Sequence, residues 1–76
     1  IFYLRLGKDL PKNNWRESYI RGYLLKSKNN QIIAMPISNQ DSSSLSSFAK
    51  ANILIIRDPN AKKIKRGSLV KAIILN

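Results

Sequence analysis

The stretch YIRGYLLKSKNNQIIAMPI, residues 19–37, decides the fold of this chain. In its first part, residues 19–26, side chains alternate between two faces with a period of two, which is the pattern of a β-strand. Residues 28–30, Lys-Asn-Asn, predict a hairpin turn, because asparagine tolerates the positive φ that tight turns require. Residues 31–37 follow as the partner strand, in which Pro36 indicates a sheet edge or a bulge. The stretch therefore predicts an antiparallel hairpin.

Three further strands are predicted on either side of this hairpin. Apolar residues alternate at 2–6, four consecutive apolar residues lie within 52–57, and the last apolar stretch is 69–75. Five strands in so short a chain would leave exposed edges in an open sheet, so a closed or half-closed barrel is expected. The predicted fold class is all-β: a small β-barrel of five to six strands with one short helix or helical turn.

Two residues within this pattern carry separate expectations. Gly22 lies inside a strand, where glycine weakens packing. It predicts a bend at a barrel corner, and the alternative is a close approach of a ligand or partner to its backbone. Trp15, in the polar segment 9–15, is expected to plug one end of the barrel rather than to serve as a ligand platform.

The one expected helix comes from NQDSSSLSSFAKAN, residues 39–52. Leu45, Phe48 and Ala49 follow the spacing of one helical face, and the serines and Asp41 before them suit an N-cap, which places the helix at 43–51. A helix start rich in hydroxyls and free N–H groups can bind an oxyanion, to which an arginine could add a charged fork. The alternative is that these serines only cap the helix.

Composition excludes several kinds of function. The chain has 76 residues, no Cys, no His and four acidic residues, so we expect no catalytic residue and no metal site within it. It has no apolar run long enough to span a membrane and no signal peptide, which predicts a soluble, cytoplasmic protein without a membrane partner. Because it begins at Ile1 rather than Met, we expect a single domain, 1–76, cut from a larger multidomain protein.

The formal charge of +10 has two interpretations. A basic small domain is typical of nucleic-acid binders. The excess of lysine, however, accompanies an excess of asparagine and isoleucine, which an AT-rich coding sequence produces without any partner. The charge alone does not decide between the two.

Two ordered motifs resemble the C-terminal domain of MoeA, the molybdopterin molybdenumtransferase family that includes gephyrin. The first corresponds to that family's Arg–acid–x–aromatic–x–Arg–Gly strand and consists of Arg16, Glu17, Tyr19, Arg21 and Gly22. The second corresponds to its Gln–x–Ser, Ser–Ser–hydrophobic and Ala–Asn steps and consists of Gln40, Ser42, Ser46, Ser47, Phe48, Ala51 and Asn52. A closing Gly–x–x–Val strand matches Gly67 and Val70. One departure is Asp41, where many members have glycine.

This resemblance implies a barrel that is the last of several domains. Family enzymes insert molybdate into adenylylated molybdopterin with the help of Mg²⁺, and their catalytic acids lie in other domains. They act as homodimers in which the C-terminal domain contributes to the rim of the active cleft. The residues that would bind substrate or anion here are Arg21, Ser42, Gln40 and Ser43. The resemblance implies no cofactor bound by this domain alone; its partners would be the parent's other domains.

Two other functions remain open from the sequence. One is a nucleic-acid-binding barrel that stacks bases on Tyr3, Tyr19 and Tyr23, although no aromatic pair alternates closely with arginine. We do not expect nucleic acid as a partner, and any such binding should be weak and electrostatic. The other is an interaction module that docks a peptide along a sheet edge.

Overall fold

A computed structural model describes residues 1–37 and 52–75. Each of its strands lies within one residue of the range that the sequence predicts. The strands are β1 (Phe2–Leu6), β2 (Ser18–Lys26), β3 (Ile32–Pro36), β4 (Ile53–Arg57) and β5 (Leu69–Ile74). The predicted helix at 43–51 lies outside the described residues.

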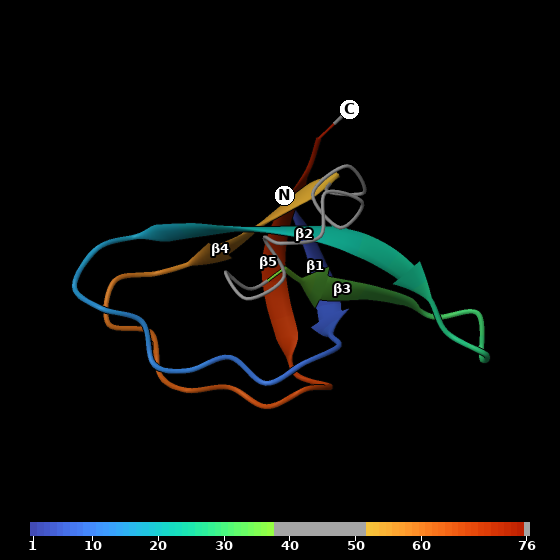
Figure 1. Cartoon of the computed structure of the whole chain (residues 1–76), viewed down its shortest axis with the longest axis horizontal. Coiled ribbons are helices and arrows are strands. Elements are labelled where there is room, and N and C mark those ends of the chain that lie inside the picture. Colours follow the sequence, from blue (N-terminus) through green and yellow to red (C-terminus); the bar gives the residue numbers. More distant parts are fainter. Residues whose placement is uncertain (38–51, 76) are drawn as a thin grey trace.

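The strands close into a barrel in the order β1-β3-β2-β4-β5 (Figure 1). Neighbouring strands are antiparallel except for β1 and β3, which pair in parallel over two register positions, Arg5 with Ile33 and Leu6 with Ala34. Closure satisfies the backbone groups that an open sheet would leave exposed at its edges. The prediction of an all-β barrel is confirmed.

The core is formed by the side chains that point inward on alternate strand positions. Strand β4 illustrates the pattern, because Ile53 and Ile55 are fully buried whereas Leu54 and Ile56 are half-buried. The other buried apolar residues of the cluster are Leu6, Leu10, Ala34 and Val70. Arg57 continues this alternation and is the last inward-facing residue of β4.

Gly22 marks the corner at which β2 changes partners. Strand β2 pairs with β4 through Ser18–Gly22 and with β3 through Gly22–Lys26. A Cβ atom at position 22 would lie 2.6 Å from the carbonyl oxygen of Met35, which is far inside van der Waals contact. The close backbone approach that requires glycine is therefore made by strand β3 of the same chain.

The predicted hairpin turn is present, and two further turns share its positive φ. Asn30 and Asn60 have φ of 63° and 60°, and Gly67 has φ of 91°, so all three adopt the left-handed region. In the β2–β3 hairpin, Asn30 N–H donates to the Ser27 carbonyl over 3.0 Å. Pro36, the last residue of β3, lies beyond the two positions at which β3 pairs with β1, which agrees with its predicted place at an edge.

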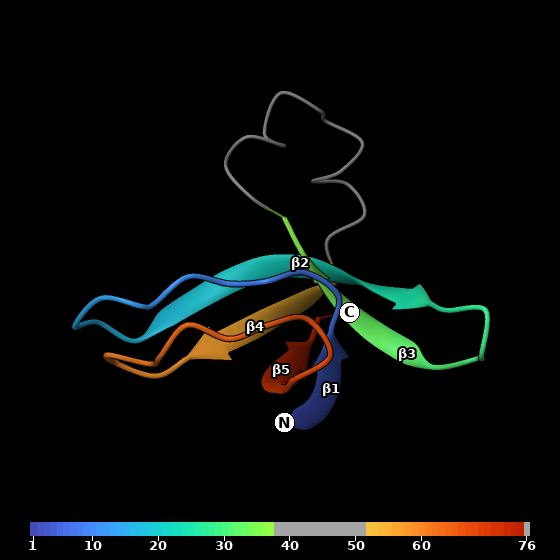
Figure 2. The same ribbon diagram turned by 90° about the horizontal axis from the view of Figure 1, so that it is seen from below.

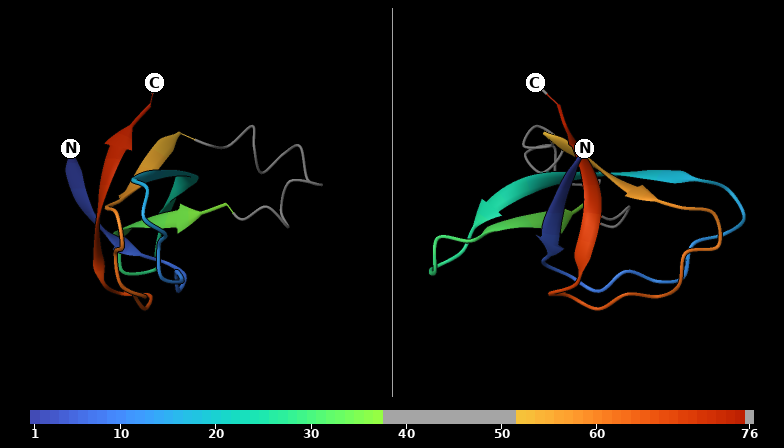
Figure 3. Two further views of the ribbon diagram at one scale, coloured as in Figure 1. Left: turned by 90° about the vertical axis from the view of Figure 1, so that its left-hand side faces the viewer. Right: turned by 180° about the vertical axis from the view of Figure 1, so that it is seen from behind.

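Two long connections, residues 7–17 and 58–68, lie side by side and are called the loop pair below (Figures 1 and 2). Leu10 and Ile64 exchange backbone hydrogen bonds of 2.9 and 3.0 Å, forming a bridge outside the strands. Closer in sequence to β2 and β4, Asn60 N–H donates to the Asn14 carbonyl over 2.7 Å. The loop pair therefore continues the barrel as an irregular, hydrogen-bonded ribbon (Figure 3).

The predicted role of Trp15 as a barrel plug is wrong. Trp15 is 69% exposed, and the guanidinium of Arg16 lies 4.6 Å from its ring centroid. Leu10, which is buried, and Ile64 pack against the core instead. The two aliphatic side chains at the bridge make the apolar contacts that were expected of Trp15, and the indole lies on the surface.

Candidate functional site

Arg21 lies on the outer wall of the barrel, at the middle of β2. It is exposed, whereas its neighbours Ile20 and Gly22 point toward the core, as the alternation in the sequence predicts. Its register partner on β4 is Leu54. The guanidinium group is thus carried by a rigid, paired strand rather than by a loop, which suits a group that must orient a ligand.

Both ends of the segment 38–51 are attached to β2 beside Arg21. On one side, Ile37 N–H donates to the carbonyl of Arg21 over 2.8 Å. On the other, Asn52 N–H donates to the carbonyl of Gly22 over 2.9 Å, and the Asn52 side-chain oxygen accepts from Leu24 N–H over 3.1 Å. The chain therefore leaves and re-enters the barrel at one place.

Gln40, Ser42 and Ser43 belong to that segment and lie outside the described residues. Their position relative to the guanidinium of Arg21 stays a prediction. The structure establishes only that the segment carrying them starts and ends against the strand that carries Arg21.

Asn52, the last residue of the second motif, has a structural role because it forms hydrogen bonds to β2 and to the end of β5. Besides its two bonds to β2, its carbonyl accepts from Leu75 N–H over 2.7 Å. One residue thus joins β2, β4 and the end of β5. At the start of β4, the Asn52 side-chain oxygen takes the place of a backbone carbonyl as the acceptor for Leu24 N–H of β2.

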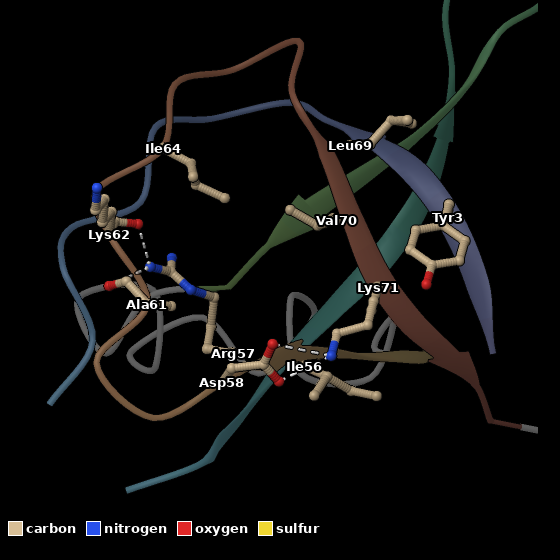
Figure 4. A pocket seen from close by; sticks show the side chains of 10 residues that line it. All are labelled: Tyr3, Ile56, Arg57, Asp58, Ala61, Lys62, Ile64, Leu69, Val70 and Lys71. Atoms are coloured by element: carbon tan, nitrogen blue, oxygen red, sulfur yellow. Dashed lines mark hydrogen bonds and ion pairs between the residues drawn. The ribbon is translucent and has the colours of Figure 1, made fainter. Parts of the chain in front are cut away.

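Arg57 is a buried charge that the sequence analysis missed. It is 4% exposed, and its Nη2 lies 3.0 Å from the Pro11 carbonyl. The same nitrogen lies 2.9 Å from the Lys62 carbonyl and 3.4 Å from that of Ala61 (Figure 4). Burial lowers the pKa of this guanidinium below its ordinary value. Its hydrogen bonds go to carbonyl groups of the loop pair, so Arg57 is a structural clamp rather than a ligand-binding group.

A hollow of about 420 Å³ opens beside Arg57, where β4 and β5 diverge (Figure 4). Its wall includes the exposed ring of Tyr3 and an ion pair in which Lys71 Nζ lies 2.8 Å from Asp58 Oδ1. The hydrogen bond to Asp58 raises the pKa of Lys71. Within this hollow the Asp58 carboxylate therefore neutralises Lys71.

Tyr3, Lys71, Ile56 and Tyr19 form one cross-strand row on the outer wall. Both tyrosines are exposed, as base stacking would require, whereas Tyr23 is half-buried. Tyr19 O–H donates to Glu17 over 2.7 Å, and this bond to a carboxylate raises the pKa of Tyr19. The lysine of this row, Lys71, is paired with Asp58, and Glu17 adds a negative charge, which together disfavour a nucleic-acid backbone there.

Within the described ranges, no three His, Cys, Asp or Glu side chains gather closely enough to hold a metal ion. The same ranges contain no helix of the length and hydropathy needed to cross a membrane.

Comparison with known proteins places the chain in a family. Its residues 3–75 match the family model of the MoeA C-terminal region, domain IV. No curated protein matches the chain. The match covers both motifs that carry the resemblance and all five strands except Phe2, the first residue of β1. This chain belongs to the MoeA C-terminal region (domain IV) family.

Proposed function

We propose that this chain is the C-terminal domain of a molybdopterin molybdenumtransferase and contributes to the rim of the parent's active cleft. Its residues for this task are Arg21, with Gln40, Ser42 and Ser43. The family match supports the parent's identity. The observation that carries the site is the attachment of both ends of segment 38–51 to β2 at Arg21–Leu24.

The proposed chemistry is the orientation of an oxyanion. Guanidinium presents a planar fork that binds two oxygens of a phosphate or molybdate group, and serine hydroxyls add neutral donors. Such groups lower the barrier by positioning rather than by bond making. The catalytic acids and the groups that bind molybdopterin and Mg²⁺ belong to the rest of the parent, and molybdate is its substrate.

The partners that follow from this proposal are the other domains of the parent and a second parent subunit in a homodimer. A domain that supplies only part of a site needs another surface to complete it. The cytoplasm is the compartment in which we expect the parent to work.

The test is the Arg21→Ala variant of the parent enzyme, assayed for synthesis of molybdenum cofactor. We expect a large loss of activity, at least about a hundredfold if one bidentate contact to the reacting anion is removed. Lys26→Ala, which removes an exposed charge at the end of the same strand, is the control and should retain activity. Full activity of a folded Arg21→Ala enzyme would refute the proposal.

A further inference from the structure

A second hollow lies at the opposite end of β3 from the segment that the proposed function uses. It has a volume of about 420 Å³ and is formed by the end of β1, the start of β3 and the turn before β5. Its lining residues are Arg5, Leu6, Gly7, Gln31, Ile33, Arg66 and Gly67. The lining carries two arginines and no acid.

Arg5 is held over this hollow by the turn. Its Nη1 donates to the Gly67 carbonyl over 3.0 Å, which fixes the guanidinium beside the glycine. A guanidinium has five N–H donors, so one bond of this kind leaves most of them available. Because Arg5 lies on β1 between Ile33 and Leu69, its backbone is set by pairing on both sides.

Arg66 and Gly67, in the turn before β5, complete the lining of this hollow. The backbone N–H of Arg66 donates to Asp9 over 2.8 Å, whereas its guanidinium makes no hydrogen bond within residues 1–37 and 52–75. Asp9 lines a neighbouring hollow with Lys8 and not this one. A Cβ atom at Gly67 would meet nothing within 4 Å, so the space beside its Cα is open. The Gly67 N–H itself donates to the Leu6 carbonyl over 2.7 Å, and the Gly67 carbonyl accepts from Arg5.

We propose that this hollow binds the phosphate groups of a small phosphorylated molecule, with Arg5 and Arg66 as the anion-binding residues and the Gln31 amide as a neutral donor. Two guanidinium groups on one lining that carries no carboxylate favour a multiply charged oxyanion. The volume exceeds that of one phosphate group and falls in the range of small-molecule sites. This proposal does not depend on the proposed function, since it uses none of the same residues.

The test is a titration of the ¹⁵N-labelled 76-residue chain with pyrophosphate, followed by amide NMR at constant ionic strength with chloride as the reference anion. We expect saturable shifts confined to residues around Gly67, Gln31 and Arg66. Arg66→Gln should weaken binding about tenfold, because a charge-assisted hydrogen bond is lost. Lys63→Gln removes the same charge from an exposed position outside the hollow and should leave binding unchanged.

Arg66→Gln is the informative variant because its side chain holds no part of the fold together, whereas Arg5→Gln also removes the bond to Gly67. Equal weakening by Lys63→Gln would overturn the proposal in favour of diffuse charge attraction. Shifts that do not saturate would also overturn it. Stronger binding of a single-stranded oligonucleotide, with shifts spread over the outer wall, would replace the small molecule by nucleic acid.

Discussion

Arg57 and Arg21 lie on neighbouring strands and differ in what surrounds them. Arg57 is buried, and its guanidinium binds carbonyl groups of the loop pair. Arg21 is exposed on the outer wall, beside the place where segment 38–51 leaves and re-enters the barrel. The difference separates two uses of the same side chain: Arg57 holds the fold together, whereas Arg21 is the residue that we propose meets the parent's substrate.

The largest expected effect is the loss of the clamp in Arg57→Ala. Carbonyl groups of Pro11 and Lys62 would lose their donor in a buried place, which should lower the free energy of unfolding by about 3 kcal/mol. Urea denaturation measures this, with the exposed Lys63→Ala as control. A loss below about 1 kcal/mol would show that the loop pair holds together without Arg57.

A somewhat smaller effect is expected for Gly22→Ala, next to Arg21. The new methyl group would meet the Met35 carbonyl oxygen at 2.6 Å, and backbone cannot move aside as a side chain can. We expect a loss of about 2 kcal/mol in the free energy of unfolding, within the range seen for overpacking. Wild-type stability with reduced cofactor synthesis in the parent would instead assign Gly22 to the site and not to the fold.

The smallest effect concerns pH. The pKa values of Tyr19 and Lys71 are raised in the folded state by Glu17 and Asp58. A group with a raised folded pKa contributes stability that is present at lower pH and is lost as the pH rises through that value. The melting temperature should therefore decline slightly above the ordinary tyrosine and lysine values of 10.0 and 10.5.

The variant Glu17→Gln/Asp58→Asn removes both causes and should flatten this part of the pH profile. A decline of the same size in that variant would mean that other groups produce it.

The contrast between Arg21 and Arg57 also explains which features could be predicted from the sequence. The strands and turns follow from local patterns, because alternation, asparagine and glycine act within a few residues. The same alternation sets Arg21 on one face of β2 with Tyr19 and Tyr23. The alternation that puts Ile53, Ile55 and Arg57 on one face of β4 also follows from the sequence. A charged residue at the end of an apolar strand, however, gives no local sign of being buried.

The loop pair could not be predicted from local patterns. Its contacts join residues far apart in the chain, such as Leu10 with Ile64, and are mainly hydrogen bonds to backbone, which leave no periodic trace in the sequence. The error over Trp15 has the same origin. A large aromatic residue suits a barrel plug, yet the bridge delivers Leu10 to the core in its place.

The most direct test of the account is a double-mutant cycle on Arg21 and Ser42 in the parent enzyme, measured as kcat/KM for molybdenum cofactor synthesis. If both residues orient one anion, the double variant Arg21→Ala/Ser42→Ala should be little worse than the poorer single variant, with a coupling of at least about 1 kcal/mol. Losses that add to within about 0.5 kcal/mol would mean that the two residues act independently, and would contradict the account.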